Sequence, residues 1–260
     1  MSGFWIGLFL VGFAVASLAY VVALRIKLMA VVDLVWSGGL GAAAIAYLLI
    51  SGADTVRAYA VVSLISVWSF RLTYHLFSDR IAKREEDPRY ENLASFWGKN
   101  SKRNFYFLFL GQIIFIAVFL WPVSIAMAGS ESEWMWFDWL GVIIASVAFV
   151  GEAIADRQLG AFRRDPSNKG KVCKRGLWRY SRHPNYFFEW LHWWAYVAFA
   201  ASTNWWLVLV GPIVMYIFLR YLTGIPHAER SSVKSRGDEY RRYQKTTSVF
   251  FPWIPREPQS

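Results

Sequence analysis

The feature that most constrains the fold of this chain is a series of apolar runs, each about 20 residues long. A bilayer core about 30 Å thick is crossed by roughly 20 apolar residues in helical conformation. Hydrophobic residues make up 56% of the 260 residues, and the mean hydropathy is positive. A helix satisfies its backbone hydrogen bonds internally, which the apolar bilayer demands. We therefore expect an all-α integral membrane protein.

Seven apolar windows predict the membrane spans, and the first is too long for a cleavable signal peptide. They lie near residues 4–24, 28–50, 57–78, 104–127, 137–155, 184–202 and 204–222. This arrangement places 26 of the 28 Lys and Arg residues in loops on one side of the membrane. Cytoplasmic loops carry most basic residues. We therefore expect a multi-pass protein of a bacterial inner membrane, with its N-terminus outside and its C-terminus in the cytoplasm.

The chain shows no internal boundary, so we expect one membrane domain with two parts. Residues 1–127 would form a four-helix part that faces the substrate, and residues 137–260 a part that binds a cofactor under cytoplasmic loops. The net charge of +10 follows from basic cytoplasmic loops, so no nucleic-acid partner is expected. Cys173 is the single cysteine, which excludes an intrachain disulfide. No His or carboxylate cluster has metal-ligand spacing, so no metal site is expected either.

A first group of candidate residues is polar side chains at membrane depth. Asp33 lies in the second window, and Tyr74 and His75 lie near the end of the third. An ionisable group inside a bilayer is costly unless it is paired or faces a wet cavity, so it is a functional candidate. The alternative is a structural ion pair between Asp33 and Arg71.

A second group follows the fifth window. Glu152 and Asp156 are four residues apart, and Arg163 follows two turns later, so all three share one helix face if the span continues into the cytoplasm. Two acids on one face repel unless a donor lies between them, and a ribose hydroxyl is such a donor. The alternative is a solvated helix end.

The third group is the stretch from Lys171 to Trp194, where a basic loop runs into an apolar helix that starts at Pro184. A helix N-terminus beside cations is an anion-binding arrangement. Membrane topology alone accounts for the cations, but not for Asn185, Glu189 and His192 inside the span. His192 taken singly is expected to be a packing residue. The group as a whole predicts one wall of a pocket.

These same residues carry a family resemblance. The run from Gly176 to Glu189, GLWRYSRHPNYFFE, resembles the C-terminal domain of steroid 5-alpha-reductases, as does Asp156-Arg157-Gln158-Leu159 upstream. The chain from Asp33 to Trp253 is similar to a bacterial branch called domain of unknown function 1295. The wider superfamily includes sterol reductases and isoprenylcysteine carboxyl methyltransferases.

The resemblance implies an NADPH-dependent oxidoreductase that acts on the C=C bond of a lipophilic enone, similar to a 3-oxo-4-ene steroid. It implies a monomer that meets membrane lipid, with its active site facing the cytoplasm. Asp156, Arg163, Asn185 and Glu189 match cofactor-binding residues of the reductases, whereas Lys171 replaces an arginine and Glu152 an asparagine. The expected cofactor-binding residues are Glu152, Asp156, Arg163, Lys171, Arg179, Arg182, His183, Asn185, Tyr186 and Glu189. The reductases' Gln-Glu pair is missing here, and Asp33, Tyr74 and His75 are the expected catalytic residues.

Two other functions stay open. S-adenosylmethionine has no phosphate and does not need a cation cluster, whereas NADPH carries about four negative charges that suit Lys, Arg and helix N–H groups. The nine basic residues between 156 and 182 favour NADPH. The paired Glu of the methyltransferases is also missing, because Glu229 lies between Ala228 and Arg230. A methyltransferase of a lipophilic substrate is the first alternative, and a non-enzymatic lipid-binding protein is the second.

Overall fold

The computed structural model describes residues 2–128 and 133–256, which form helices and their connections without any strand. This confirms the predicted all-α class. The helices of the first half are α1 (Ser2–Ile26), α2 (Val31–Ser51), α3 (Val56–Leu76), η1 (Phe77–Ile81), α4 (Pro88–Trp97), η2 (Gly98–Asn100) and α5 (Ser101–Met127). Those of the second half are α6 (Trp136–Arg164), η3 (Pro166–Asn168), η4 (Gly176–Arg179), α7 (Pro184–Phe199), α8 (Trp205–Val208), α9 (Val210–Ile217), η5 (Phe218–Leu222) and α10 (Ile225–Thr246).

The described part of the chain contains six helical segments long and apolar enough to cross a membrane. They correspond to α1, α2, α3, α5, α6 and the run that begins at Trp205. The other expected span is α7, which has 16 residues and is therefore about 24 Å long, less than the bilayer core. The run from Trp205 is apolar up to Leu222, and charged residues crowd α10 beyond it. The predicted count of seven thus differs from the six segments found, because α7 is short.

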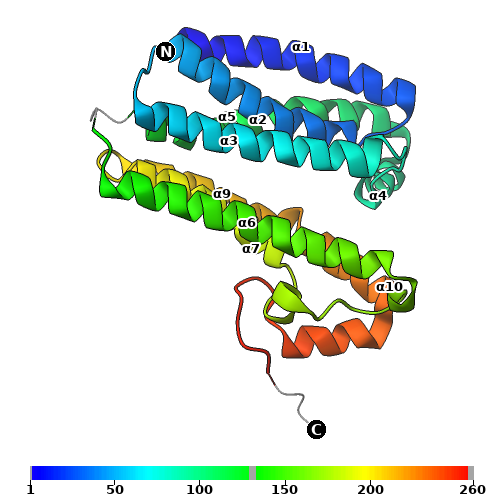
Figure 1. Ribbon diagram of the computed structural model, residues 1–260. Coiled ribbons are helices and arrows are strands. Elements are labelled where there is room, and N and C mark those ends of the chain that lie inside the picture. Colours follow the sequence, from blue (N-terminus) through cyan, green and yellow to red (C-terminus); the bar gives the residue numbers. More distant parts are fainter. Residues whose placement is uncertain (1, 129–132, 257–260) are drawn as a thin grey trace. The chain divides into compact units, whose positions relative to one another are not determined.

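The chain divides into two compact units. Unit 1 comprises Met1–Met135 and Phe199–Val208, and unit 2 comprises Trp136–Ala198 and Leu209–Ser260. In unit 1, α2 packs against α1, α3 and α5, and the short α4 lies at the end of α5 (Figure 1). Unit 2 holds α6, most of α7, α9 and the kinked α10, whose bend lies at Gly237 with a φ of 53°.

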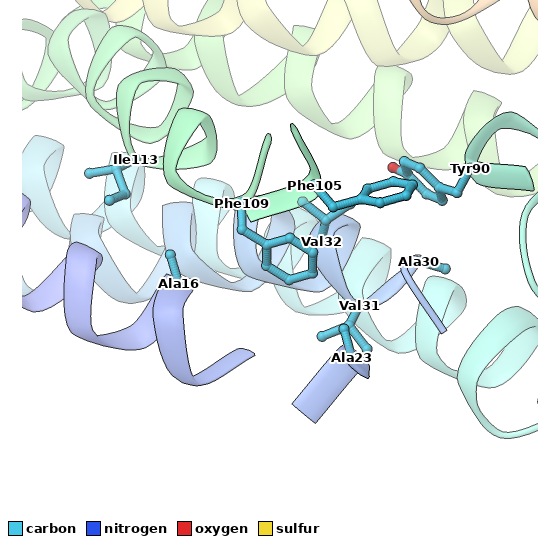
Figure 2. Packing of buried hydrophobic residues seen from close by; sticks show 9 residues of the cluster. All are labelled: Ala16, Ala23, Ala30, Val31, Val32, Tyr90, Phe105, Phe109 and Ile113. Carbon is cyan, nitrogen blue, oxygen red and sulfur yellow. The ribbon is translucent and has the colours of Figure 1, made fainter. Parts of the chain in front are cut away.

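Alternating large and small side chains form the core of unit 1 at the α1–α2–α5 contact. Phe105 and Phe109 of α5 pack against Ala16 and Ala23 of α1 and Val32 of α2 (Figure 2). Small residues on α1 leave room for these rings, and close contact is what holds helices together in a bilayer, where apolar burial drives little association. Tyr90 of α4 joins the same cluster, which brings the loop between α3 and α5 into the core.

Local sequence signals fix the helix ends. Thr55 caps α3 by accepting a hydrogen bond from the Ala58 N–H at 3.1 Å. Gly52 ends α2 in the left-handed conformation, with a φ of 67°. Asp87 caps α4, and Pro88 occupies its first turn, where a missing N–H leaves no bond unmade. The segment 79–103, expected as a loop, therefore contains a capped helix.

Gly151 sets the contact between α6 and α7 in unit 2. A methyl group placed there would lie 2.3 Å from a ring carbon of Phe188, which is too close to be accommodated without a shift. We expect Gly151→Ala to lower the free energy of unfolding by about 1–3 kcal/mol through overpacking. The measurement is thermal unfolding in detergent. Gly111→Ala on α5 is the control, since nothing lies within 4 Å of the added methyl and alanine favours the helix. Equal stability of the two variants would contradict the close contact.

Candidate functional site

The predicted cofactor wall begins on α6, which continues as one helix to Arg164, as its acidic stripe requires. Glu152 is buried at 7% exposure, Asp156 is half-buried and Arg163 is exposed. The burial of the stripe therefore decreases toward the end of the helix. A carboxylate as buried as that of Glu152 requires donors, because an unpaired buried charge is strongly unfavourable.

The connector from Lys171 to His183 is held on α6 by hydrogen bonds near a glycine turn. Gly176 has a φ of 58°, which favours glycine, and the next N–H, of Leu177, donates to Oε1 of Gln158 at 2.9 Å. The indole N–H of the buried Trp178 donates to the Ala155 carbonyl at 2.9 Å. These bonds place the connector beside Asp156.

Asn185, in the first turn of α7, contacts that acidic stripe. Its side-chain amide Nδ2 donates to Oδ1 of Asp156 at 3.3 Å. Its carbonyl oxygen Oδ1 is buried and accepts no hydrogen bond from the residues that the structure describes. Buried amide oxygens are rarely left unsatisfied, and each such case needs an explanation. A ligand donor at this position would satisfy Oδ1.

Arg182 and His183 meet Glu229 of α10 rather than open solvent. The Arg182 guanidinium donates through Nε to Oε1 of Glu229 at 2.6 Å and through Nη2 to Oε2 at 3.2 Å. Its Nη1 donates to the Gln244 and Thr247 carbonyls at 2.9 and 2.7 Å. Tyr240 and Gln244 also donate to Glu229. We call Arg182, His183, Glu229, Tyr240 and Gln244 the Glu229 cluster.

The Glu229 cluster lies outside the apolar spans, and the pKa values of its members show which of them are charged. Burial would raise the pKa of Glu229, but hydrogen bonds from His183, Arg182 and Gln244 lower it to about 2. Burial lowers the pKa of His183 below its ordinary value, although Glu229, 3.3 Å away, opposes this shift. Glu229 is therefore ionised and His183 is mostly neutral near neutral pH. Tyr186 stacks on the His183 ring, with the centroids 5.5 Å apart.

The remaining expected cofactor residues divide into exposed and buried ones. Lys171 and Arg179 are exposed on the connector. Glu189 is buried at 7% exposure on α7, one turn after Asn185. Farther along α7, the buried His192 shares a hydrogen bond of 2.7 Å with Tyr196 through Nε2, as a packing histidine would. The structure thus brings Asp156 and Asn185 together and leaves Arg163, Lys171 and Arg179 at the surface.

Of the expected catalytic residues, Asp33 is held by the neighbouring helix α4 in unit 1. Its Oδ1 accepts from the Tyr90 hydroxyl at 2.6 Å, and its Oδ2 accepts from Nη2 of Arg89 at 3.0 Å. Arg89 also pairs with Asp87 at 3.0 Å. Asp33 therefore forms an ion pair, but with Arg89 and not with Arg71, the partner that the sequence suggested. The reason is that α4 folds back to the start of α2.

Tyr74 and His75 lie on α3 with exposed side chains. Their neighbour Thr73 faces α2, where its hydroxyl contacts that of Ser37 at 2.9 Å. Successive residues of a helix are rotated by about 100°, so Tyr74 and His75 point away from that contact. Neither side chain is joined to Asp33 by a hydrogen bond in the structure.

Sequence reasoning missed three contributors to these clusters: Glu86, Arg89 and Tyr90. Glu86 accepts from the Met29 and Ala30 N–H groups, the latter at 3.0 Å, at the start of α2. The signal was present as Asp87-Pro88, a helix cap followed by a first-turn proline. It predicts α4, although it does not predict which carboxylate α4 approaches.

The helices and the polar clusters at their ends define a multi-pass helical membrane protein. The chain belongs to the family described as "Protein of unknown function (DUF1295)", whose model matches residues 19–247. The expected membership of that branch is therefore confirmed.

The chain is also similar to one curated protein, in a match that covers a smaller part of the chain than the family model does. The chain is 28% identical over 218 residues to an uncharacterized protein of Schizosaccharomyces pombe, in a match that covers 72% of this chain and 61% of the relative. The chain thus spans less than two thirds of the relative's length. No solved structure matches this chain.

Proposed function

We propose that this protein is a membrane-embedded reductase that uses NADPH to reduce the C=C bond of a lipophilic enone, such as a 3-oxo-4-ene steroid. The observation that carries the proposal is the buried Oδ1 of Asn185, which accepts no hydrogen bond within the described part of the chain while Nδ2 is held by Asp156. A ribose hydroxyl or a carboxamide N–H is a donor of the kind that Oδ1 lacks. The resemblance to steroid 5-alpha-reductases supports the same assignment.

The residues of unit 2 fit such a nucleotide in three ways. Asn185 and Asp156 present an acceptor and a carboxylate that would bind hydroxyl or amide donors. Lys171 and Arg179 are exposed and free to meet phosphate groups, to which Lys binds as a point charge and Arg as a fork. The start of α7 adds backbone N–H donors. Glu152, Glu189 and Arg163 would complete the polar wall.

Two of the residues expected to bind the cofactor, Arg182 and His183, are instead occupied within the Glu229 cluster. Arg182 uses Nε, Nη1 and Nη2 on Glu229 and on backbone carbonyls, and His183 contacts the same carboxylate. We therefore propose that both residues position the start of α7, with Tyr186 stacked on His183, instead of binding phosphate directly. A nucleotide would then bind to the N–H groups of the first turn of α7, which these contacts hold in a fixed position.

NADPH, when bound, supplies a hydride to the β-carbon of the enone. The protein must polarise the substrate carbonyl as negative charge develops there, which requires a positioned hydrogen-bond donor. Tyr74 and His75 are exposed candidates for this donor, whereas Asp33 already accepts from Tyr90 and Arg89. We further propose a bacterial inner membrane with the nucleotide side in the cytoplasm, on the basis of the loop charges, and a monomer that takes its substrate from the lipid.

Binding of NADPH to the purified protein tests the proposal. We expect Asn185→Ala to weaken NADPH binding about fivefold, because one hydrogen bond from a buried site contributes on the order of 1 kcal/mol and 1.4 kcal/mol is a factor of ten. Titration calorimetry in detergent measures the dissociation constant. Asn204→Ala is the matched control, since Asn204 is exposed and lies outside the site.

The same preparation separates the competing functions. Loss of NADPH absorbance with an enone panel, and a product heavier by two hydrogens, is the result expected of a reductase. Binding of S-adenosylmethionine with transfer of a labelled methyl group would instead establish a methyltransferase. Binding of neither nucleotide would refute both enzymatic assignments and leave a lipid-binding protein.

A further inference from the structure

The C-terminal segment after α10 returns to the ends of the membrane spans. Phe250 and Phe251 pack against Trp190 of α7, with ring centroids 5.8 and 5.4 Å away, and against Tyr216 of α9 at 5.2 and 6.1 Å. Phe187 of α7 lies 6.1 Å from both rings. This aromatic cluster lies within the first two turns of α7, about 10 Å along its axis.

We place the start of α7 at the bilayer surface, because the basic connector precedes it and apolar residues follow it. The aromatic cluster then lies close to the boundary between lipid and water. The headgroup layer on each side of the hydrocarbon core is roughly 5–8 Å thick. Trp and Tyr concentrate there because their rings are apolar and their polar atoms remain hydrated. Phe251 is thus fixed near the bilayer surface, and the residues that follow cannot be far from it.

Beyond Phe251 the chain exposes large apolar side chains instead of burying them. We call residues 251–254 the tail tip. Trp253 is 72% exposed and Ile254 is 76% exposed, next to the exposed ring of Tyr180. Together with Pro252 these residues line a shallow surface hollow. Fully hydrated, such side chains would forgo about 1.5–3 kcal/mol of burial energy each.

Backbone hydrogen bonds in and just after the tail tip hold it in place, and two prolines there reduce the number of N–H groups that a membrane would have to accommodate. The Trp253 N–H donates to the Tyr180 carbonyl at 2.9 Å, and the Arg256 N–H donates to the Thr246 carbonyl at 2.8 Å. Pro252 and Pro255 have no N–H group. The exposed Arg256 follows the tail tip after Pro255, where a lipid phosphate would be met.

We propose that the tail tip is a lipid anchor: Trp253 and Ile254 insert into the interface of the same membrane that the spans cross. The fixed backbone means that insertion requires no folding of the tail. The anchor holds the connector at Tyr180, and with it the start of α7, against the bilayer. This inference does not depend on the proposed reductase activity.

Site-directed spin labelling tests the anchor in vesicles of phosphatidylcholine and phosphatidylglycerol. The label is placed at Trp253→Cys in a Cys173→Ser background, and its collisions with oxygen and with a water-soluble nickel chelate are compared. We expect oxygen to dominate at position 253. A label at Asp238→Cys, on the polar α10 with a side chain 81% exposed, should show the reverse.

Two results would overturn the proposal. Dominant access of the nickel chelate at position 253, as at position 238, would place the tail tip in water. Protection from both reagents would mean that protein, such as a second copy of the chain, covers it. If Cys173→Ser does not fold, tryptophan fluorescence provides a second test. The emission of Trp253 is obtained by subtracting the emission of Trp253→Phe from that of the wild type, in vesicles with brominated and with unbrominated acyl chains. Weaker Trp253 emission in the brominated vesicles supports insertion, and equal Trp253 emission in both excludes it.

Discussion

Glu229→Ala is expected to lower the free energy of unfolding of the second unit by about 3–5 kcal/mol, the cost of removing one partner from a buried ion pair. Arg182 is only 10% exposed in its side chain, so the substitution leaves its charge desolvated. Tyr240 and Gln244 lose the same acceptor. Thermal unfolding in detergent measures the change. Asp238→Ala, which removes the surface pair with Arg241, should be close to wild type.

The pH dependence of stability provides a second readout of Glu229. Its pKa of about 2 in the folded protein is lower than the ordinary value of 4.5. A carboxyl group with a depressed pKa contributes stability that is complete above 4.5 and is lost as the pH falls toward 2. Glu229→Gln, which cannot ionise, should lack this contribution and be less stable than wild type at neutral pH. If wild type and Glu229→Gln lose stability in the same way as the pH falls, the ionised form of Glu229 is not stabilised by its neighbours.

Arg89→Ala is expected to have the second large effect, a loss of about 3–5 kcal/mol in unit 1, because it removes the positive partner of Asp33 and one of the two arginines that pair with Asp87. The contact joins α4 to the start of α2, so the loop should also become more sensitive to proteolysis. Unfolding in detergent and limited proteolysis measure these effects. Lys83→Ala is the control, since it removes only the exposed pair with Asp79. An unchanged Arg89→Ala would mean that Asp33 is stabilised in another way.

The double variant Asp33→Asn/Arg89→Met separates a structural role of Asp33 from a catalytic one. Neutralising Asp33 together with Arg89 removes the unpaired charge at Asp33, while Asp87 keeps its pair with Arg80, so we expect part of the stability lost in Arg89→Ala to return. If Asp33 acts only through this pair, the double variant should keep its enone turnover. A folded double variant without turnover, but with normal NADPH binding, would instead assign Asp33 to catalysis.

The fold was largely predictable, because hydrophobic length and helix-cap residues act locally along the chain. The windows at 4–24, 28–50 and 57–78 correspond to α1, α2 and α3. The window 204–222 is divided between α8, α9 and η5, a subdivision that hydropathy does not reveal. In the window 184–202, the helix α7 is only 16 residues long and ends at Phe199, before the end of the window.

The candidate site was predictable only in part. The spacing of residues along the sequence shows which side chains share one face of a helix, but it does not show which residues of other elements they contact. The i,i+4 stripe on α6 and Asn185 on α7 were correctly expected to lie on helices, and Asp156 and Asn185 are in contact. Arg182 and His183 were expected at a nucleotide, yet their partner is a carboxylate 46 or 47 residues later in the chain. No local signal links positions so far apart.

The sequence by itself determined that this chain crosses a membrane through apolar helices, because each span follows from the hydropathy of its own residues. It also determined membership of its family, whose model matches residues 19–247. Only the tertiary structure decided which charges are paired: Asp33 with Arg89, and Arg182 with Glu229. The physical reason is that a buried charge takes its partner from whatever the fold brings within about 3 Å, and long-range packing sets that choice.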